Sequence, residues 1–360
     1  MTDQREKRPV SGRPNSLDIA YQAGVSQATV SRALRGSSLV SESTRLRVEE
    51  VARELNYKVD KSASNLRTQR SNTLALLLFE DPTADGPAIN PFFLSMLASI
   101  TRASARVGQD LLVSFQQLSD DWQADYENTH KADGLILLGY GDFIEYRSKL
   151  DRLNRRGAHF VRWGSAQPGQ PGIVIGCDNV AGGRELTRHL ISLGRRRIAF
   201  IGTQTKQYPE FRDRYAGYFR VLRDSGLAVD PALQVDAITT EESGYAAMKS
   251  LIDSKARFDA VFGASDLIAI GAMQALLEAG YDIPGQISIA GFDDIPAATY
   301  ARRPLTTIQQ DTRRAGAILV ESLLHLINEE AVEGRMIPGK LVVRDSCGAS
   351  ESKKQVEPEA

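Results

Sequence analysis

Residues 17–35 read LDIAYQAGVSQATVSRALR and decide the first part of the fold. The stretch predicts two short helices separated by a tight turn. Gly24 permits the positive φ that ends a helix sharply, and Ser26 stands where an N-cap belongs, because its hydroxyl can accept a backbone N–H. Small residues such as Ala20 and Ala23 suit a close helix crossing. We therefore expect a helix-turn-helix, whose second helix enters the major groove of DNA. The alternative is an ordinary helical hairpin within a core.

Charge is unevenly distributed along the 360-residue chain. Residues 1–70 contain 13 Lys and Arg against 8 Asp and Glu, a net charge of +5, whereas the remainder carries −6. A basic head on a mildly acidic body suits a protein whose head alone contacts DNA. The hydrophobic fraction of 42% is typical of a globular protein, and this length predicts two or three domains.

Several classes of protein are not expected from this composition. No apolar run approaches the length of a transmembrane helix and no signal-peptide core is present, so we expect a cytoplasmic protein without membrane contact. Cys177 and Cys347 are too few for a metal cluster, and a disulfide is not expected in that compartment. No Ser/His/Asp set, catalytic carboxylate pair or metal-type His spacing occurs. We therefore expect no enzyme activity, no cofactor and no metal site.

Two segments separate the helix-turn-helix from the rest of the chain. Residues 44–55 predict a third helix with Ser41 as its N-cap, in which either Leu46 or Val48 faces the core. The polar segment 57–71 that follows predicts a linker, except that residues 62–67 could form one or two helical turns.

From Thr73 onward, apolar runs of strand length alternate with amphipathic helical stretches. This alternation predicts parallel sheets covered by helices on both faces. About ten such strands indicate two sheets rather than one long sheet, and ligands of such folds bind at the carboxyl ends of the strands. The clearest runs are 74–79, 111–115, 134–138, 159–161, 173–176, 198–201, 260–262 and 287–290.

Motifs spread from residue 17 to about 347 resemble, in order and spacing, those of the lac repressor family (LacI/GalR) of transcription regulators. They are DIA-x-x-AGVS-x-x-TVSRAL at 18–34, ARELNY at 52–57, DGLIL at 133–137, GRRRIAFIG at 194–202, RYAGY at 214–218, SDLIAIGA at 265–272, ISIAGFDD at 287–294 and PLTTIQQD at 304–311.

The resemblance implies an α + α/β architecture: a helix-turn-helix headpiece, a hinge, and a core of two Rossmann-like subdomains similar to periplasmic sugar-binding proteins. The implied boundaries are 1–70 for the headpiece with its hinge, 71–348 for the effector-binding and dimerisation core, and 349–360 for a disordered tail. Within the core, the N-subdomain would comprise about 71–177 and 311–336, and the C-subdomain about 178–310 and 337–348.

The resemblance also implies a homodimer that binds palindromic operator DNA and responds to a small molecule. We expect a repressor of a carbohydrate-utilisation operon that a small sugar releases from its operator. One alternative is a regulator that needs a corepressor, such as a purine or another small metabolite. Another is a sugar-binding transport protein, which has no use for residues 17–66. No leucine heptad follows Leu341, so a dimer is favoured over a tetramer.

Family position places Gln27 and Ala28 against bases in the major groove, with Arg32 in reach. Arg suits guanine, Gln suits adenine, and Ala28 can pack on a thymine methyl. Leu66 matches a leucine that the family inserts into the minor groove, where an apolar wedge kinks the duplex. The alternatives are a solvated Gln27 and a loose leucine on a linker. The predicted DNA contacts are Ser26, Gln27, Ala28, Thr29, Ser31, Arg32 and Leu66.

The resemblance places the effector pocket between the subdomains, with Arg214 and Asp293 as its main polar contacts. Arg offers a fork of donors and Asp offers acceptors for sugar hydroxyls. Ser265 replaces an Asn that is common in sugar-binding members. Arg162 and Trp163 could offer a further fork and a stacking face. Structural roles remain open as alternatives. Arg214 could form a surface ion pair, and Asp293 could be a turn residue. Arg162 and Trp163 could be a buried structural pair, and Phe92 and Phe93 could be ordinary core residues. The predicted effector contacts are Phe92, Phe93, Arg162, Trp163, Arg214, Ser265 and Asp293.

Overall fold

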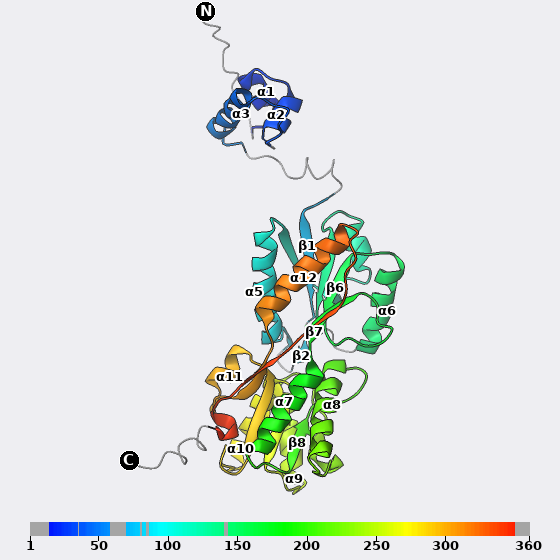
Figure 1. Cartoon of the computed structure of the whole chain (residues 1–360), viewed down its shortest axis with the longest axis vertical. Coiled ribbons are helices and arrows are strands. Elements are labelled where there is room, and N and C mark those ends of the chain that lie inside the picture. Colours follow the sequence, from blue (N-terminus) through cyan, green and yellow to red (C-terminus); the bar gives the residue numbers. More distant parts are fainter. Residues whose placement is uncertain are drawn as a thin grey trace, which may run out of the picture. The chain divides into compact units, whose positions relative to one another are not determined.

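The computed structural model describes residues 14–34, 36–57, 70–79, 81–83, 86–139 and 143–349. The chain divides into two units, a headpiece that ends at Gln69 and a core that begins at Arg70 (Figure 1). The predicted wedge residue Leu66 and positions 350–360 of the predicted tail lie outside the described residues.

The headpiece contains three described helices: α1 (Ser16–Ala23), α2 (Gln27–Ala33) and α3 (Glu42–Glu54). A capping box begins α1, because the Asn15 side chain accepts from Asp18 N while the Asp18 carboxylate accepts from Asn15 N. Gly24 ends α1 with a φ of 65°, and Ser26 caps α2 by accepting from Thr29 N at 3.1 Å. These local signals make the sharp turn between the two helices.

The headpiece core is made of small and medium apolar side chains, which are Ile19, Ala20, Ala23, Val30, Ala33, Val48 and Ala52. The third helix begins at Glu42, two residues earlier than expected, with Ser41 as its cap. An acidic residue in the first turn is favourable beside the positive helix end. Val48 is fully buried whereas Leu46 is 56% exposed, so Val48 is the core residue of the two.

The first subdomain of the core is built on a sheet of six strands in the order β13-β7-β6-β5-β1-β4. All neighbouring strands in it are parallel. Helices α5 (Pro91–Arg106) and α12 (Thr312–Ile327) pack together on one face, and α6 (Phe143–Arg155) lies on the other (Figure 1). The strands are β1 (Thr73–Leu78), β4 (Asp110–Phe115), β5 (Gly134–Leu138), β6 (Phe160–Trp163), β7 (Ile173–Cys177) and β13 (Arg335–Ile337).

The second subdomain has a sheet in the order β14-β12-β11-β10-β8-β9. Its strands are β8 (Ile198–Ile201), β9 (Gln234–Val235), β10 (Ala260–Gly263), β11 (Ser288–Asp293), β12 (Thr306–Gln309) and β14 (Lys340–Val342). Its helices are α7 (Asn179–Ser192), α8 (Pro209–Asp224), α9 (Glu241–Asp253), α10 (Asp266–Glu278) and α11 (Pro296–Tyr300). Strand β14 runs antiparallel to β12, although the sequence pattern predicted parallel pairing. Strand β14 contains only three residues, which are too few for a hydrophobic pattern that could identify the strand and its pairing.

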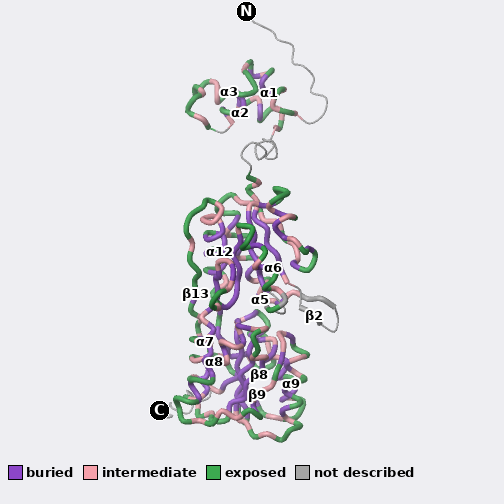
Figure 2. The backbone as a smooth tube through the Cα atoms, turned by 90° about the vertical axis from the view of Figure 1, so that its right-hand side faces the viewer, coloured by how far each residue is buried: buried purple, intermediate pink, exposed green. Residues whose placement is uncertain are grey.

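The chain passes between the two sheets after β7, after β12 and after β13. A small antiparallel pair, β2 (Asp81–Thr83) and β3 (Gly86–Ala88), lies apart from both sheets. Buried residues follow the strands of both subdomains (Figure 2). The fold therefore has two sheets joined by three connections, and one apolar cluster contains buried residues of both subdomains.

Two glycines bring α7 and α8 into close contact. A Cβ on Gly183 would lie 2.3 Å from the Arg214 carbonyl oxygen, and one on Gly217 would lie 2.3 Å from that of Val180. Any larger residue would push the helices apart, because both obstacles are backbone atoms. This packing fixes α8, and with it the side chain of Arg214, against α7.

Candidate functional site

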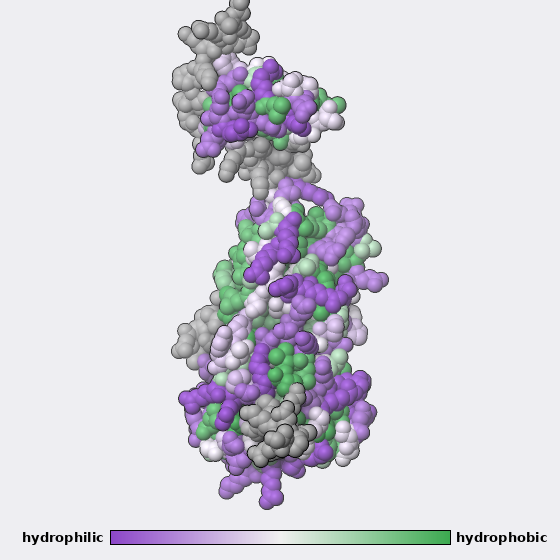
Figure 3. Space-filling view, turned by 60° about the vertical axis from the view of Figure 1, so that its left-hand side comes forward, coloured by the Kyte–Doolittle hydropathy of each residue, from purple (hydrophilic) through white to green (hydrophobic). Residues whose placement is uncertain are grey.

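The exposed side of α2 carries most of the predicted DNA contacts. Ser26, Gln27, Ala28 and Arg32 are exposed, and Thr29 and Ser31 are half-buried. Gln27 Nε2 donates to Ser16 Oγ at 2.8 Å, so the start of α1 orients this side chain. The face of the headpiece seen in Figure 3 is mainly hydrophilic. This arrangement suits insertion of the start of α2 into a DNA groove.

Sequence reasoning missed a second exposed face of the headpiece. Leu17 is 61% exposed and Tyr21 is 51% exposed, and both lie on α1. They are four residues apart and therefore lie on one side of the helix. The signal that could have found them is their position opposite the buried Ile19 and Ala23.

An ion pair between Arg214 of α8 and Asp293 of β11 forms the centre of the candidate effector site. Its Nη2–Oδ1 distance is 3.3 Å, and both side chains are buried. Arg214 Nε also donates to Asn179 Oδ1 at 2.9 Å, and Nη1 donates to Ala264 O at 2.5 Å. Gln310 Nε2 donates to Asp293 Oδ1 at 2.6 Å. The network connects α7, α8 and β11 with the residues that directly follow β10 and β12 around one charged pair.

Sequence reasoning missed Asn179 and Gln310. Asn179 follows the carboxyl end of β7 by two residues, and Gln310 directly follows β12. Their position after strand ends is the signal that could have found them, because ligands of parallel sheets bind at that edge.

The backbone at Asp293 is strained. Its φ is 121° and that of the next residue, Asp294, is 56°. Non-glycine residues held at such angles cost on the order of 1–3 kcal/mol and concentrate at functional sites. The strained residue Asp293 is also the partner of Arg214, and this coincidence supports a binding role for the pair.

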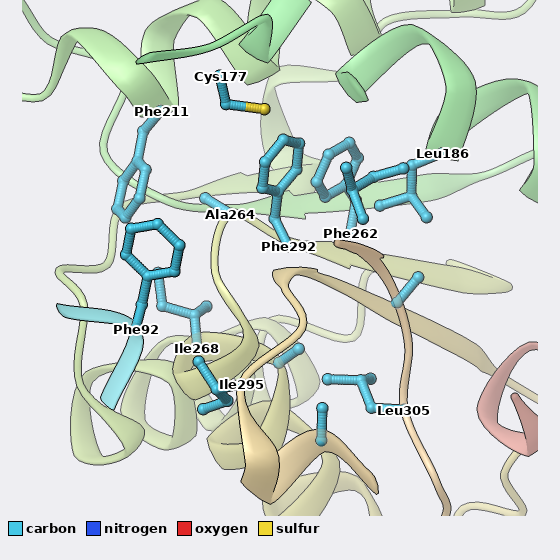
Figure 4. Close-up of a cluster of buried hydrophobic side chains, with 14 of the residues drawn as sticks. Phe92, Cys177, Leu186, Phe211, Phe262, Ala264, Ile268, Phe292, Ile295 and Leu305 are labelled. Carbon is cyan, nitrogen blue, oxygen red and sulfur yellow. The ribbon is translucent and has the colours of Figure 1, made fainter. Parts of the chain in front are cut away.

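Aromatic side chains surround the charged pair. The guanidinium carbon of Arg214 lies 3.8 Å from the ring centroid of Phe292 and 5.5 Å from that of Phe211. From the first subdomain, Phe92 contacts Trp163 with ring centroids 5.9 Å apart. Phe92, Phe211 and Phe292 belong to one apolar cluster beside Cys177 (Figure 4). Aromatic faces beside polar groups are typical of sugar and metabolite pockets.

The other predicted effector contacts have structural partners. Phe93 packs against Gly139, where an added Cβ would lie 2.8 Å from its ring. Arg162 is buried, and its Nη2 donates to Gln170 Oε1. Ser265 is buried and caps α10 by accepting from Ile268 N at 3.3 Å. The described contacts therefore join Arg214 with Asp293, and Phe92 with Trp163.

Hydrogen bonds cross between the subdomains beside this site. Ser165 N, in the loop after β6, donates to Glu210 Oε1 at 2.7 Å, and Ser165 Oγ donates to Asp213 Oδ2. Gln167 Nε2 also donates to Asp213 Oδ2 at 3.2 Å, and Arg212 Nη2 donates to Gln167 Oε1. Sequence reasoning missed all of these residues. They hold the subdomains together at the first turns of α8.

Burial dominates the electrostatics of two acidic residues in the second subdomain, Asp293 and Asp266. It raises the pKa of Asp293 to about 6, although the Arg214 charge opposes the shift. Burial and the charge of Asp293 raise the pKa of Asp266 to about 7. Asp266 is held by bonds from Thr307 Oγ1 at 2.5 Å and Ile295 N at 2.9 Å. The two carboxylates are therefore more easily protonated in the folded than in the unfolded chain.

The raised pKa of Asp266 predicts the direction in which pH changes the stability of the fold. The pKa of Asp266 is near 3.8 when unfolded and about 7 when folded, so between these values the folded state binds more protons. The contribution of Asp266 to the free energy of unfolding is therefore lost as pH rises from about 4 to about 7, so the fold becomes less stable over this range. We expect Asp266→Asn to gain stability relative to the wild type across that range. Urea unfolding at pH 5, 6, 7 and 8 tests this, and a pH-independent difference would contradict it.

Metal ligands and membrane spans are not found in the part of the chain that the structure describes. There, no group of three or more His, Cys, Asp and Glu is placed to hold a metal ion. None of the described helices is both long and apolar enough to cross a membrane. Cys177 and Cys347 are buried free thiols. Arg195, Arg196 and Arg197 all donate to backbone carbonyls within the second subdomain, which fits a structural role.

Comparison with known proteins identifies the two parts of the chain. Residues 17–60 match the model of bacterial regulatory proteins of the lacI family, and residues 187–347 match a periplasmic binding protein-like domain. The regulator RegA of Clostridium saccharobutylicum is 30% identical over 336 residues, which cover 91% of this chain and 98% of RegA. The chain therefore belongs to the lacI family of bacterial regulatory proteins.

Two solved structures support the fold. A complex of the transcriptional regulator CelR with cellobiose is 29% identical, covers 93% of this chain and 100% of its own, and has a TM-score of 0.68. The lac repressor dimer bound to operator has a TM-score of 0.78 at 24% identity, covering 93% of this chain and 99% of its own. The expected headpiece and two-subdomain core are thereby confirmed. The chain is a DNA-binding transcription regulator and not an enzyme, and the transport-protein alternative is wrong.

Proposed function

We propose that the chain is a cytoplasmic homodimeric repressor of carbohydrate-utilisation genes, which binds a palindromic operator and leaves it when a small sugar binds the core. The observation that carries the proposal is the buried pair of Arg214 and Asp293 with aromatic rings around it. A fork of donors beside acceptors suits neighbouring sugar hydroxyls, and an aromatic face suits the apolar side of a sugar ring. The related CelR was solved with cellobiose.

The headpiece supports operator binding by a specific route. Exposed Gln27 and Arg32 lie on α2, and two copies of α2 in a dimer would reach two half-sites about one helical turn apart. Residues 1–70 carry a net charge of +5, which suits contact with phosphates.

Operator binding is expected to be sequence-specific and to weaken steeply with salt, since each released counterion contributes to the slope. Selection from a randomised duplex pool should yield a palindrome, whose affinity is then measured by fluorescence anisotropy between about 50 and 200 mM salt, a range over which phosphate contacts give losses of about 10³–10⁵. Equal affinity for all sequences, or binding that does not respond to salt, would refute the DNA-binding part of the proposal.

The effector is identified by a thermal-shift screen of the full chain with monosaccharides, disaccharides and purines. A ligand at 100 times its Kd stabilises the folded state by about 2.7 kcal/mol. The sugar that raises Tm should also release the operator. A screen in which purines alone stabilise the chain would contradict the sugar proposal and leave operator binding intact.

A further inference from the structure

The chain enters the first subdomain through residues 70–72, which directly precede β1. Segment 58–69, which joins this point to the headpiece, lies outside the described residues. Three parts of the first subdomain bond to residues 70–72: the end of α12, the loop before β5 and the start of β4. The core therefore fixes the point from which the chain runs to the headpiece.

The carboxylate of Asp133 is the first anchor of this entry point. Its Oδ1 accepts from Ser71 N at 2.6 Å and from Ser71 Oγ at 2.9 Å, and its Oδ2 accepts from Asn72 N at 2.8 Å. Asn72 has a φ of 52°, which is uncommon for a residue with a side chain. Because hydrogen bonds to an ionised group are stronger than neutral ones, Asp133 holds the backbone of residues 71 and 72 in this turn.

The guanidinium of Arg70 is the second anchor. Its Nη1 donates to Asn328 Oδ1 at 3.0 Å, and its Nη2 donates to Ile327 O at 3.2 Å, both at the end of α12 (Figure 1). The last carbonyl groups of a helix have no partner within the helix and carry partial negative charge, so a cation is favourable there. Arg70 therefore fastens the entry point to α12.

Helix α12 is a rigid support for the second anchor. It packs closely on α5, since a Cβ on Gly316 would lie 2.8 Å from the backbone carbonyl carbon of Ser99. It also contacts β5, β6 and β7 of the first sheet. Close-packed interiors deform little, so the end of α12 keeps its place relative to the sheet.

The exposure of Arg70 argues against a role in the stability of the core. Its side chain is exposed and lies outside the sheet, and substitutions at exposed positions usually change stability little. The effect of its two hydrogen bonds therefore falls on the geometry of residues 70–72 and on the segment that continues from them to the headpiece.

We propose that Arg70 and Asp133 are positioning residues for operator binding: they fix where the chain leaves each core, so that the two headpieces of a dimer reach half-sites at one spacing. A dimer reads half-sites separated by a helical turn or a multiple of it. Anchors that exist before DNA binds reduce the conformational entropy that binding must remove. The proposal rests on operator binding by a dimer, as in the proposed function, but not on the nature of the effector.

The test uses the full chain and the palindrome selected from the randomised pool. Affinity is measured for three duplexes: the selected operator, a random duplex, and the operator with about two base pairs inserted at its centre, which separates the half-sites by about 7 Å more. Arg70→Gln removes the guanidinium, Arg70→Lys keeps a charge there, and Asp133→Ala removes the acceptors. Arg220→Gln, at an exposed position on α8, is the matched control.

We expect Arg70→Gln and Asp133→Ala each to bind the selected operator about tenfold more weakly, the change that corresponds to ordering the backbone of one further residue on binding. Their affinity for the lengthened operator should fall less, so that the preference for the selected spacing decreases. Arg70→Lys should recover part of the loss. Random DNA should bind all variants equally, and Arg220→Gln should match the wild type.

Two results with Arg70→Gln would overturn the proposal. One is a spacing preference equal to that of the wild type. The other is an equal loss of affinity for random DNA and for operator, because Arg70 would then act as an ordinary phosphate contact. Thermal unfolding of Arg70→Gln should match that of the wild type, which separates positioning from a general loss of stability.

Hydrogen exchange without DNA tests the anchor independently of the proposed function. The amides of Ser71 and Asn72 should be protected in the wild type and should exchange faster in Asp133→Ala, because the carboxylate accepts from both. Unprotected amides in the wild type overturn the proposal. A wild type that selects no palindrome overturns the proposed function, whereas protection that depends on Asp133 still supports the anchor.

Discussion

Replacing Arg214 with alanine is expected to lower the free energy of unfolding of the core by about 3–5 kcal/mol, the range for removing one partner of a buried ion pair. The change leaves the buried Asp293 carboxylate without its cation and removes the donor to Asn179 Oδ1 and Ala264 O. It also opens a space against the ring of Phe292. Urea unfolding followed by tryptophan fluorescence measures the destabilisation, since both tryptophans lie in the core.

The control for this prediction is Arg220→Ala, an exposed position on the same helix, which should change stability by less than about 0.5 kcal/mol. Arg214→Met combined with Asp293→Asn should cost less than the sum of the two single changes, because neither charge is then left alone. At temperatures where the Arg214→Ala variant stays folded, it should bind operator and fail to respond to the sugar that releases the wild type. A destabilisation by Arg214→Ala below about 1 kcal/mol would show that Asp293 does not depend on this cation.

Replacing Gln27 with alanine is expected to weaken binding to the selected operator by about 1–3 kcal/mol in each half-site, because the side chain can no longer bond a base edge. A dimer carries the change in both half-sites. Gln27 is exposed at the first position of α2, and its amide is oriented by Ser16. The effect should fall on specificity, so affinity for random DNA should change little. Anisotropy titrations with operator and random duplexes at one salt concentration measure both.

A second variant separates direct contact from orientation. Ser16→Ala keeps the Gln27 side chain but removes the hydroxyl that holds it, and it should weaken operator binding in the same way but by less. Circular dichroism should show an unchanged headpiece in both variants. If Gln27→Ala binds operator as tightly as the wild type, this residue does not contact a base.

Local sequence alone determined the helix-turn-helix of the headpiece and the alternation of strands and helices in the core. Gly24 and Ser26 set the turn between α1 and α2 through interactions with residues at most a few positions away. The runs that became β1 and β5 are continuous apolar segments, as expected for strands buried on both faces. Such signals lie within one short window of the chain, so no knowledge of the fold was needed to find them.

Other features depended on the tertiary structure. The antiparallel pairing of β14, the partners of Arg214 and Asp293, and the bonds from Ser165 to α8 join segments far apart in sequence. The sequence indicated Arg214 and Asp293 through their motifs, whereas Asn179 and Gln310 are identified only by their hydrogen bonds to this pair in the folded chain. The hydrogen bonds from Gln167 to Asp213 and from Arg212 to Gln167 likewise join the loop after β6 to the start of α8. Because these partners lie far apart in the chain, only the packing of the two subdomains brings them together.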